Sequence, residues 1–117
     1  MSFFDNNKIT YISQKVFDSC KYKAVLPFDF YLPDYNLCIE YQGEHHYFPI
    51  EHFGGQKLFE IQQIRDQIKH KYCENNNIKL LCIPYTDKNK IEKILEKELL
   101  IKRQQNGIYI FRYKNRN

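Results

Sequence analysis

The sequence of 117 residues contains no tryptophan, no Cys-x-x-Cys pair and no apolar run long enough to cross a membrane. Its four cysteines are dispersed, and Cys38 and Cys82 lie inside apolar strand patterns, where a thiol behaves as a small hydrophobic group. We therefore expect buried, reduced thiols in preference to disulfides or a zinc site. Residues 1–5 lack a basic region followed by an apolar stretch, so the sequence predicts a cytoplasmic protein that does not bind a membrane.

The composition of the chain indicates one globular domain. Hydrophobic residues make up 43% of the sequence, which is sufficient for one core, while 117 residues are too few for two domains. The net charge of +4 favours a polyanionic partner, although an ordinary soluble surface can carry the same charge. We expect a single domain over residues 1–117, with residues 1–8 as a polar lead-in and residues 107–117 as an extra strand and basic tail.

Two alternating runs predict a β-hairpin over residues 28–42. Apolar side chains alternate with polar ones on both sides of residues 33–36, which is the two-residue period of strands. If residues 33–36 form the turn, Asp29 falls opposite Glu40 on one face of the sheet. The same register gives three apolar pairs on the other face: Leu32 with Leu37, Phe30 with Ile39 and Phe28 with Tyr41.

Asp29 and Glu40 form the first candidate site. Directly opposed residues have Cβ atoms about 4.5 to 5.5 Å apart, and like charges at that distance destabilise a sheet unless a positive group lies between them. Two carboxylates with several retained waters suit Mg²⁺ or Mn²⁺ better than zinc. The alternative, from spacing alone, is that one acid is solvated and the other forms a salt bridge on an exposed face.

A glycine-bracketed loop follows the hairpin at residues 43–55. It contains His45, His46 and His52, and we expect it to lie beside the carboxylates. The spacing of these histidines matches no standard zinc pattern, so His46 is interpreted as a hydrogen-bonding or proton-handling group. A zinc-binding interaction domain that uses cysteine and histidine is kept as an alternative.

Apolar residues at three- and four-residue spacing predict a helix over residues 56–74. Its buried stripe would consist of Leu58, Ile61, Ile64, Ile68 and Tyr72. Steps of 100° per residue place a polar group along one edge of that stripe, made up of Gln62, Asp66, Lys69 and Cys73. The Lys69 ammonium would neutralise the acids from this edge. The alternative is a surface ion pair between Asp66 and Lys69.

The run at residues 78–83 is almost continuously apolar and stops at Pro84, which predicts a buried strand. Because a strand reached through a helix usually lies parallel to the strand before that helix, we place it in the sheet of the hairpin. Thr86 or Asp87 would start a second helix. The buried stripe of this helix would consist of Ile91, Ile94, Leu95 and Leu99.

The remaining segments complete the predicted fold. Residues 9–14 have strand composition, residues 16–24 are interpreted as a loop, and residues 108–113 again have strand composition. This last strand would extend the sheet edge or pair with a second subunit, giving a homodimer through an edge strand. The sequence therefore predicts an α/β fold with a central mixed sheet of four to five strands, flanked by two main helices.

Residues 26–33 (LPFDFYLP) and 37–46 (LCIEYQGExH) resemble the PD-(D/E)xK nuclease superfamily. The closer similarity is to phage and giant-virus endonuclease-like proteins related to the very-short-patch repair endonucleases. It runs from about residue 9 to residue 95 and includes the patterns RDxxK at residues 65–69 and LxIPY at residues 81–85. The resemblance implies a restriction-endonuclease-like domain, a phage or viral setting and Mg²⁺- or Mn²⁺-dependent hydrolysis of phosphodiester bonds.

The resemblance also implies roles for residues of the hairpin. Asp29 and Glu40 match the two acids of the family and would hold the metal ion together with the backbone carbonyl of Tyr41. Gln42 stands where the superfamily usually has a lysine, and a glutamine supplies no positive charge. Lys69, from the helix edge, would place an ammonium in the same space and help to position the attacking water.

The other implied roles concern proton transfer and substrate binding. His46 matches the family's histidine after the Gly-Glu pair and would donate a proton to the leaving oxygen, with Asp66 as a supporting helix acid. Phosphate contacts would come from basic residues, namely Lys57 and Arg65 of the predicted helix and Lys114 and Arg116 of the tail. DNA is the expected substrate and RNA the alternative. The rival hypothesis is a catalytically silent nucleic-acid-binding or assembly module that has kept the fold.

Overall fold

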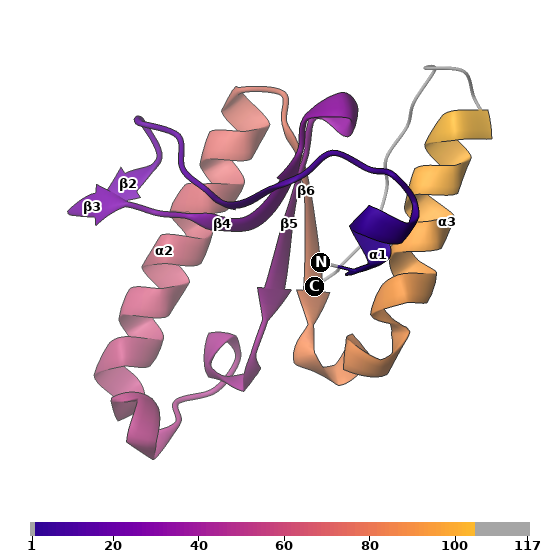
Figure 1. Ribbon diagram of the computed structural model, residues 1–117. Coiled ribbons are helices and arrows are strands. Elements are labelled where there is room, and N and C mark those ends of the chain that lie inside the picture. Colours follow the sequence, from indigo (N-terminus) through magenta and orange to yellow (C-terminus); the bar gives the residue numbers. More distant parts are fainter. Residues whose placement is uncertain (1, 105–117) are drawn as a thin grey trace.

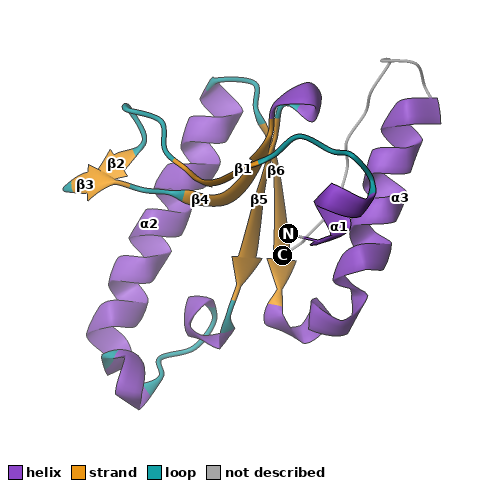
Figure 2. Ribbon diagram, viewed as in Figure 1, coloured by secondary structure: helices purple, strands orange, loops and turns teal. Residues whose placement is uncertain are grey.

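The structure is a computed structural model, and it describes residues 2–104 of the chain. Its strands are β1 Ile12–Lys15, β2 Lys21–Tyr22, β3 Ala24–Val25, β4 Phe28–Leu32, β5 Leu37–Gln42 and β6 Lys79–Pro84. Its α-helices are α1 Ser2–Asn6, α2 Gly55–Asn75 and α3 Ile91–Gln104. A four-stranded sheet of order β1-β4-β5-β6 lies between α2 on one side and α1 with α3 on the other (Figures 1 and 2). This arrangement confirms the expected α/β class, the mixed sheet and the two main helices.

The predicted hairpin is formed by β4 and β5. Its turn is a 3₁₀ segment at Pro33–Tyr35, followed by Asn36 in the left-handed region at φ 50°. The side chain of Asn36 accepts a hydrogen bond from the Tyr31 hydroxyl and donates one to the carbonyl of Asn77. The antiparallel register pairs Phe30 with Ile39 and Leu32 with Leu37, as predicted from the alternation.

The alternation breaks at the start of β4, which corrects the predicted register. The Cα pairing of β4 with β5 covers residues 30–32 and 37–39, so the expected pairs of Phe28 with Tyr41 and of Asp29 with Glu40 are not part of the ladder. Phe28 packs in the α2-side core, whereas Phe30 packs against the core on the α1 and α3 side. The reversal occurs at Asp29, where side-chain hydrogen bonds connect the two strands.

The chain returns from α2 to the sheet as predicted. Strand β6 pairs with β5 in parallel from Leu37 with Lys79 to Gln42 with Pro84. Strand β5 carries buried side chains on both faces, because it is a central strand with helices on either side. The helix α3 begins at Ile91 after a 3₁₀ segment at Tyr85–Lys90, and Leu95 and Leu99 are buried as expected.

The face that α2 presents to the sheet differs from the predicted apolar stripe. Leu58 and Ile64 are 47% and 39% exposed, although the periodicity predicted that they would be buried. The polar edge predicted beside that stripe instead holds partly or fully buried residues: Gln62, Asp66, Lys69 and Cys73. The physical reason lies on the sheet, where Glu40 is buried and has the ammonium of Lys69 from the helix as its partner.

Residues 2–8 are not the polar lead-in that the sequence indicated. They contain the short helix α1, in which Phe3 is 7% exposed and Phe4 fully buried. The Phe4 ring packs edge-on against Phe30 at a centroid distance of 5.3 Å and also contacts Tyr11. These aromatic residues join α3 and the sheet in one core, so the N-terminal segment covers the apolar flank on that side.

Two further segments differ from prediction. The first sheet strand is Ile12–Lys15 in place of residues 9–14, and the supposed loop at residues 16–24 contributes the small β2–β3 hairpin. The predicted strand at residues 108–113 and the tail beyond it lie outside the described residues. The four cysteines are buried and unbridged, as predicted. Among residues 2–104, no helix combines the length and apolarity needed to cross a bilayer.

Candidate active site

Asp29 and Glu40 connect the ends of β4 and β5 where the regular ladder stops. The backbone N–H of Asp29 donates to Oε2 of Glu40 at 3.0 Å, and the backbone N–H of Tyr41 donates to Oδ2 of Asp29 at 2.7 Å. Each carboxylate therefore takes the place of a main-chain carbonyl in the pairing of the two strands. This exchange fixes the orientation of both acids without a metal ion.

Lys69 reaches Glu40 from α2. Its Nζ lies 2.9 Å from Oε1 of Glu40 and 5.2 Å from the centre of the Phe28 ring. Burial raises the pKa of Glu40 above its ordinary value, and Asp29 raises it further by charge repulsion, while Lys69 lowers it. The sequence-based placement of Lys69 beside the acids is thus reproduced by the structure.

His46 and Asp66 form a second pair, about one helical turn before Lys69 on α2. The Nδ1 atom of His46 lies 3.0 Å from Oδ2 of Asp66, and Gln62 donates to the other oxygen of Asp66 at 3.0 Å. In the tautomer assigned to this contact, Nδ1 donates to the carboxylate and Nε2 is the ring nitrogen that takes no part in it. The Gln63 side chain donates a hydrogen bond to the backbone carbonyl of His46, so α2 fixes both the backbone and the ring of this residue.

Asp29, Glu40, His46 and Lys69 line one cleft of about 480 Å³, here called the carboxylate cleft, whereas Asp66 lies behind His46 and does not line it. Its walls come from the β2–β3 hairpin, the ends of β4 and β5, the 3₁₀ segment at Glu44–His46 and α2. Its chemically active lining comprises Asp29, Glu40, Tyr41, His45, His46, Gln62, Arg65 and Lys69. The cleft therefore combines two acids, a lysine, an arginine and histidine.

Other predicted site residues lie elsewhere. Gln42 is only 8% exposed and accepts a hydrogen bond from the Tyr47 hydroxyl at 2.6 Å, and it does not line the carboxylate cleft. Lys57 is exposed on the first turns of α2 but does not line the cleft either. Lys114 and Arg116 are outside the described residues.

The donor set of the carboxylate cleft fits a hard divalent cation. Asp29 and Glu40 are close enough to interact electrostatically, and both line the open cleft together with Tyr41. Among residues 2–104, no group of three or more histidine, cysteine, aspartate and glutamate side chains is arranged to hold a metal ion. Mg²⁺ commonly uses one or two carboxylates and keeps its waters, so the two acids suffice for this chemistry, whereas a zinc site needs more protein ligands.

Sequence reasoning missed the hairpin that borders the cleft. Tyr22 and Val25 line the cleft from β2 and β3, whose two-residue strands are too short to show a period. It also left Gln62 without a role, although glutamine four residues before aspartate is a spacing at which helix side chains interact. His45 was passed over too, and burial and the neighbouring His46 lower its pKa.

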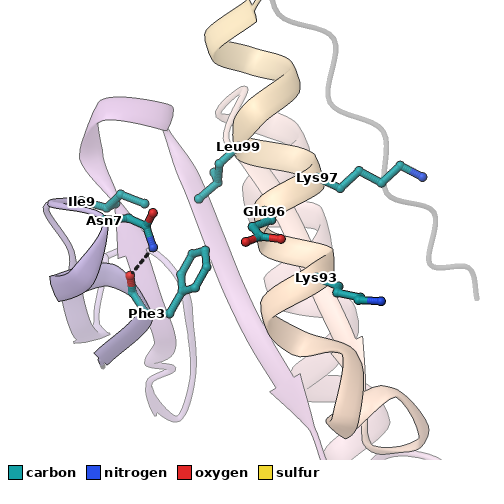
Figure 3. A pocket seen from close by; sticks show the side chains of 7 residues that line it. All are labelled: Phe3, Asn7, Ile9, Lys93, Glu96, Lys97 and Leu99. Carbon is teal, nitrogen blue, oxygen red and sulfur yellow. Dashed lines mark hydrogen bonds between the residues drawn. The ribbon is translucent and has the colours of Figure 1, made fainter.

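A second cavity, of about 540 Å³, lies between α1 and α3 (Figure 3). Phe3, Ile9 and Leu99 form its apolar part, while Lys93 and Lys97 extend away from Phe3 at its edge. This cavity shares no lining residue with the carboxylate cleft and contains a single carboxylate and no histidine. The carboxylate cleft is therefore the better candidate for catalysis.

The chain is similar to three viral proteins. It is 43% identical over 65 residues to uncharacterized protein 307L of Invertebrate iridescent virus 6, covering 55% of this chain and 33% of that protein. It is 35% identical over 98 residues to uncharacterized protein 094L of Frog virus 3, covering 75% and 63%. With uncharacterized protein 033L of Invertebrate iridescent virus 3 it shares 36% identity over 64 residues, covering 54% and 33%.

These similarities support the viral part of the expected setting. The chain spans between 33% and 63% of the length of these curated relatives. No family model matches the sequence, and no solved structure matches the fold.

Proposed function

We propose that this protein is a Mg²⁺- or Mn²⁺-dependent endonuclease of the PD-(D/E)xK type that hydrolyses phosphodiester bonds in DNA. The observation that carries the proposal is the connection of Asp29 and Glu40 through backbone N–H groups, with the Lys69 ammonium 2.9 Å from Glu40, all lining one cleft. Two oriented acids and a lysine beside an open cleft are the groups that hydrolysis of a phosphodiester requires.

Asp29, Glu40 and the carbonyl of Tyr41 are the groups that would hold the ion, which when bound supplies the positive charge that activates water and stabilises the pentavalent transition state. The Lys69 ammonium offsets developing negative charge and helps to orient the water. As the imidazolium, with a proton on each ring nitrogen, His46 would give the Nε2 proton to the leaving oxygen and become neutral, while Asp66 positions the ring through Nδ1.

Binding of the substrate strand would rest on basic side chains near the cleft. Arg65 lines the cleft and is exposed, so its guanidinium can contact a backbone phosphate next to the carboxylates. Lys57 lies two to three turns before Arg65 on α2 and would contact the strand farther from the scissile bond. Affinity from such contacts falls as salt rises and depends little on sequence.

The test is cleavage of supercoiled plasmid with Mg²⁺ or Mn²⁺, comparing the wild-type chain with Asp29→Ala and with Asp34→Ala. Asp34 is an exposed acid of the hairpin turn that does not line the cleft, so it is a matched control. We expect nicking by the wild type and by Asp34→Ala, and none by a folded Asp29→Ala. Equal nicking by all three, or none by any with either metal, contradicts the proposal. Matched DNA and RNA oligonucleotides decide the substrate.

The second candidate is a catalytically silent nucleic-acid-binding or assembly module. It is favoured by Gln42, which is buried against Tyr47 and adds no positive charge to the cleft. This candidate predicts salt-dependent DNA binding without cleavage, and equal affinity of the wild type and Asp29→Ala in the presence of Mg²⁺. Cleavage that depends on Asp29 eliminates it.

A further inference from the structure

A mostly apolar pocket of about 380 Å³, here called the Phe4 pocket, lies on the α1 and α3 side of the sheet. Its floor side chains are no more than 3% exposed and belong to Phe4, Ile39, Ile83 and Leu95. Polar groups enter the lining only from Ser13, Gln14, Asp29 and Tyr41, all of them at the end of the sheet that carries the acids. Apolar walls with few polar groups, at this volume, are typical of small-ligand pockets.

The Phe4 pocket and the carboxylate cleft have three residues in common: Gln14, Asp29 and Tyr41. Asp29 and Tyr41 are themselves joined by the 2.7 Å hydrogen bond between β4 and β5. A group held in the Phe4 pocket therefore lies next to the proposed site of phosphodiester hydrolysis. A strand whose phosphate occupies the cleft can place a neighbouring part of the same nucleotide in the pocket.

The backbone is irregular at the wall between the two cavities. Gln14 has φ 52°, whereas its neighbours Ser13 and Lys15 pair regularly with Phe30 and Phe28 of β4. A left-handed glutamine inside a strand is strained and persists only where its surroundings enforce it. The consequence of this distortion is that the exposed Gln14 side chain stands at the border of both cavities.

We propose that the Phe4 pocket receives one unstacked base of the nucleic-acid strand and that Gln14 binds the polar edge of that base. The proposal rests on the nucleic-acid substrate of the proposed function. A phosphate would lose its hydration against the apolar floor, whereas a base has apolar faces that can pack on the partly exposed Phe30 ring. The carboxamide of Gln14 offers both donors and an acceptor, which matches the mixed hydrogen-bonding edge of a base.

The experiment uses single-stranded oligonucleotides that carry 2-aminopurine at successive positions, with EDTA present so that binding is measured without cleavage. The fluorescence of 2-aminopurine rises when the base leaves the stack. We expect a rise at one position with the wild type and loss of that rise with Gln14→Ala. Ile91→Phe places a larger side chain in the pocket from α3 and fills part of it, so this variant should lose the fluorescence rise as well. Ile64→Phe, on the exposed face of α2, is the control and should keep it.

The affinity for oligonucleotides with and without the base gives a second readout, which a folding defect in a variant would not reproduce. We expect removal of the base at the responsive position, by an abasic substitution, to weaken binding to the wild type about five-fold or more. The same substitution should leave binding to Gln14→Ala or Ile91→Phe nearly unchanged, because these variants have already lost the contact. Equal weakening in the wild type and both variants overturns the proposal.

The outcomes separate this inference from the proposed nuclease function. Cleavage in Mg²⁺ by a wild type that unstacks no base overturns the pocket assignment and leaves the nuclease proposal standing. Unstacking without cleavage supports the pocket and contradicts the nuclease proposal. Failure to bind any oligonucleotide overturns the pocket assignment, and plasmid cleavage with Mg²⁺ or Mn²⁺ then decides the nuclease proposal by itself.

Discussion

The ammonium of Lys69 lies 2.9 Å from Oε1 of Glu40, and the two side chains are 12% and 6% exposed. This pair is the contact by which helix α2 meets the acid end of the sheet. Glu40 also receives the backbone N–H of Asp29, so its second oxygen is satisfied as well. A buried charge with both oxygens satisfied is tolerable, whereas the same charge without its partner is costly. Stability and the proposed chemistry therefore depend on one contact.

Lys69→Met is predicted to lower the free energy of unfolding by roughly 3 to 5 kcal/mol at neutral pH, because Glu40 is left as an unpaired buried charge. Burial raises the pKa of Glu40 and Lys69 opposes that rise, so the variant has an even higher Glu40 pKa. An acid whose pKa is raised in the folded state stabilises the fold at low pH, where it is protonated. This stabilisation is lost as the pH rises through the folded-state pKa. The difference in unfolding free energy between the wild type and Lys69→Met should therefore be smaller at acidic pH.

Urea unfolding of the wild type and Lys69→Met at neutral and acidic pH measures this change. Glu40→Gln with Lys69→Met completes a double-mutant cycle, and the double variant should be more stable than Lys69→Met alone at neutral pH. If the stability difference between the wild type and Lys69→Met is the same at both pH values, Glu40 is not an unpaired buried charge in the variant.

Lys69→Met is also predicted to slow plasmid cleavage far more than Lys97→Met, since the first removes the ammonium from the cleft and the second changes an exposed residue of α3. Initial rates should be measured at a pH and temperature where both variants are folded. Similar rates for the two would remove Lys69 from the proposed mechanism.

His46→Ala is predicted to slow cleavage of a phosphodiester by about 10² to 10⁴-fold, through loss of the proton donor. Asp66→Asn should cause a smaller loss, because the ring is kept but its orientation is not. Bis-p-nitrophenyl phosphate, whose leaving group needs no proton, should be cleaved almost normally by both variants and not by Asp29→Ala. If His46→Ala is equally slow on both substrates, His46 does not donate the proton.

Phe4→Ala is predicted to destabilise the fold by about 3 to 5 kcal/mol, because Phe4 is fully buried and packs against Phe30. Phe48→Ala is the matched control, since Phe48 is 51% exposed, and its effect should be within about 0.5 kcal/mol. Thermal unfolding by circular dichroism measures both. Equal effects would mean that α1 is not part of the core.

Local periodicity was sufficient for the hairpin turn, the pairs Phe30 with Ile39 and Leu32 with Leu37, the parallel return strand and the apolar stripe of α3. It was also sufficient to place Asp66 and Lys69 on one edge of α2, because helical spacing fixes which side chains are neighbours. It could not give the burial of Phe4, since five residues are too few to show a helical period.

The sequence by itself indicated which side chains meet at the acid end of the sheet: Asp29 and Glu40 through alternation on either side of the hairpin turn, and Lys69 through helical spacing. Only the tertiary structure decided how they meet. The ladder between β4 and β5 ends after Phe30, and the carboxylates themselves accept the next main-chain hydrogen bonds. The buried Glu40 is paired with Lys69 of the polar edge of α2, whereas Leu58 of the predicted apolar stripe is exposed. Desolvation depends on all the surrounding elements at once, so no local pattern in the sequence contains it.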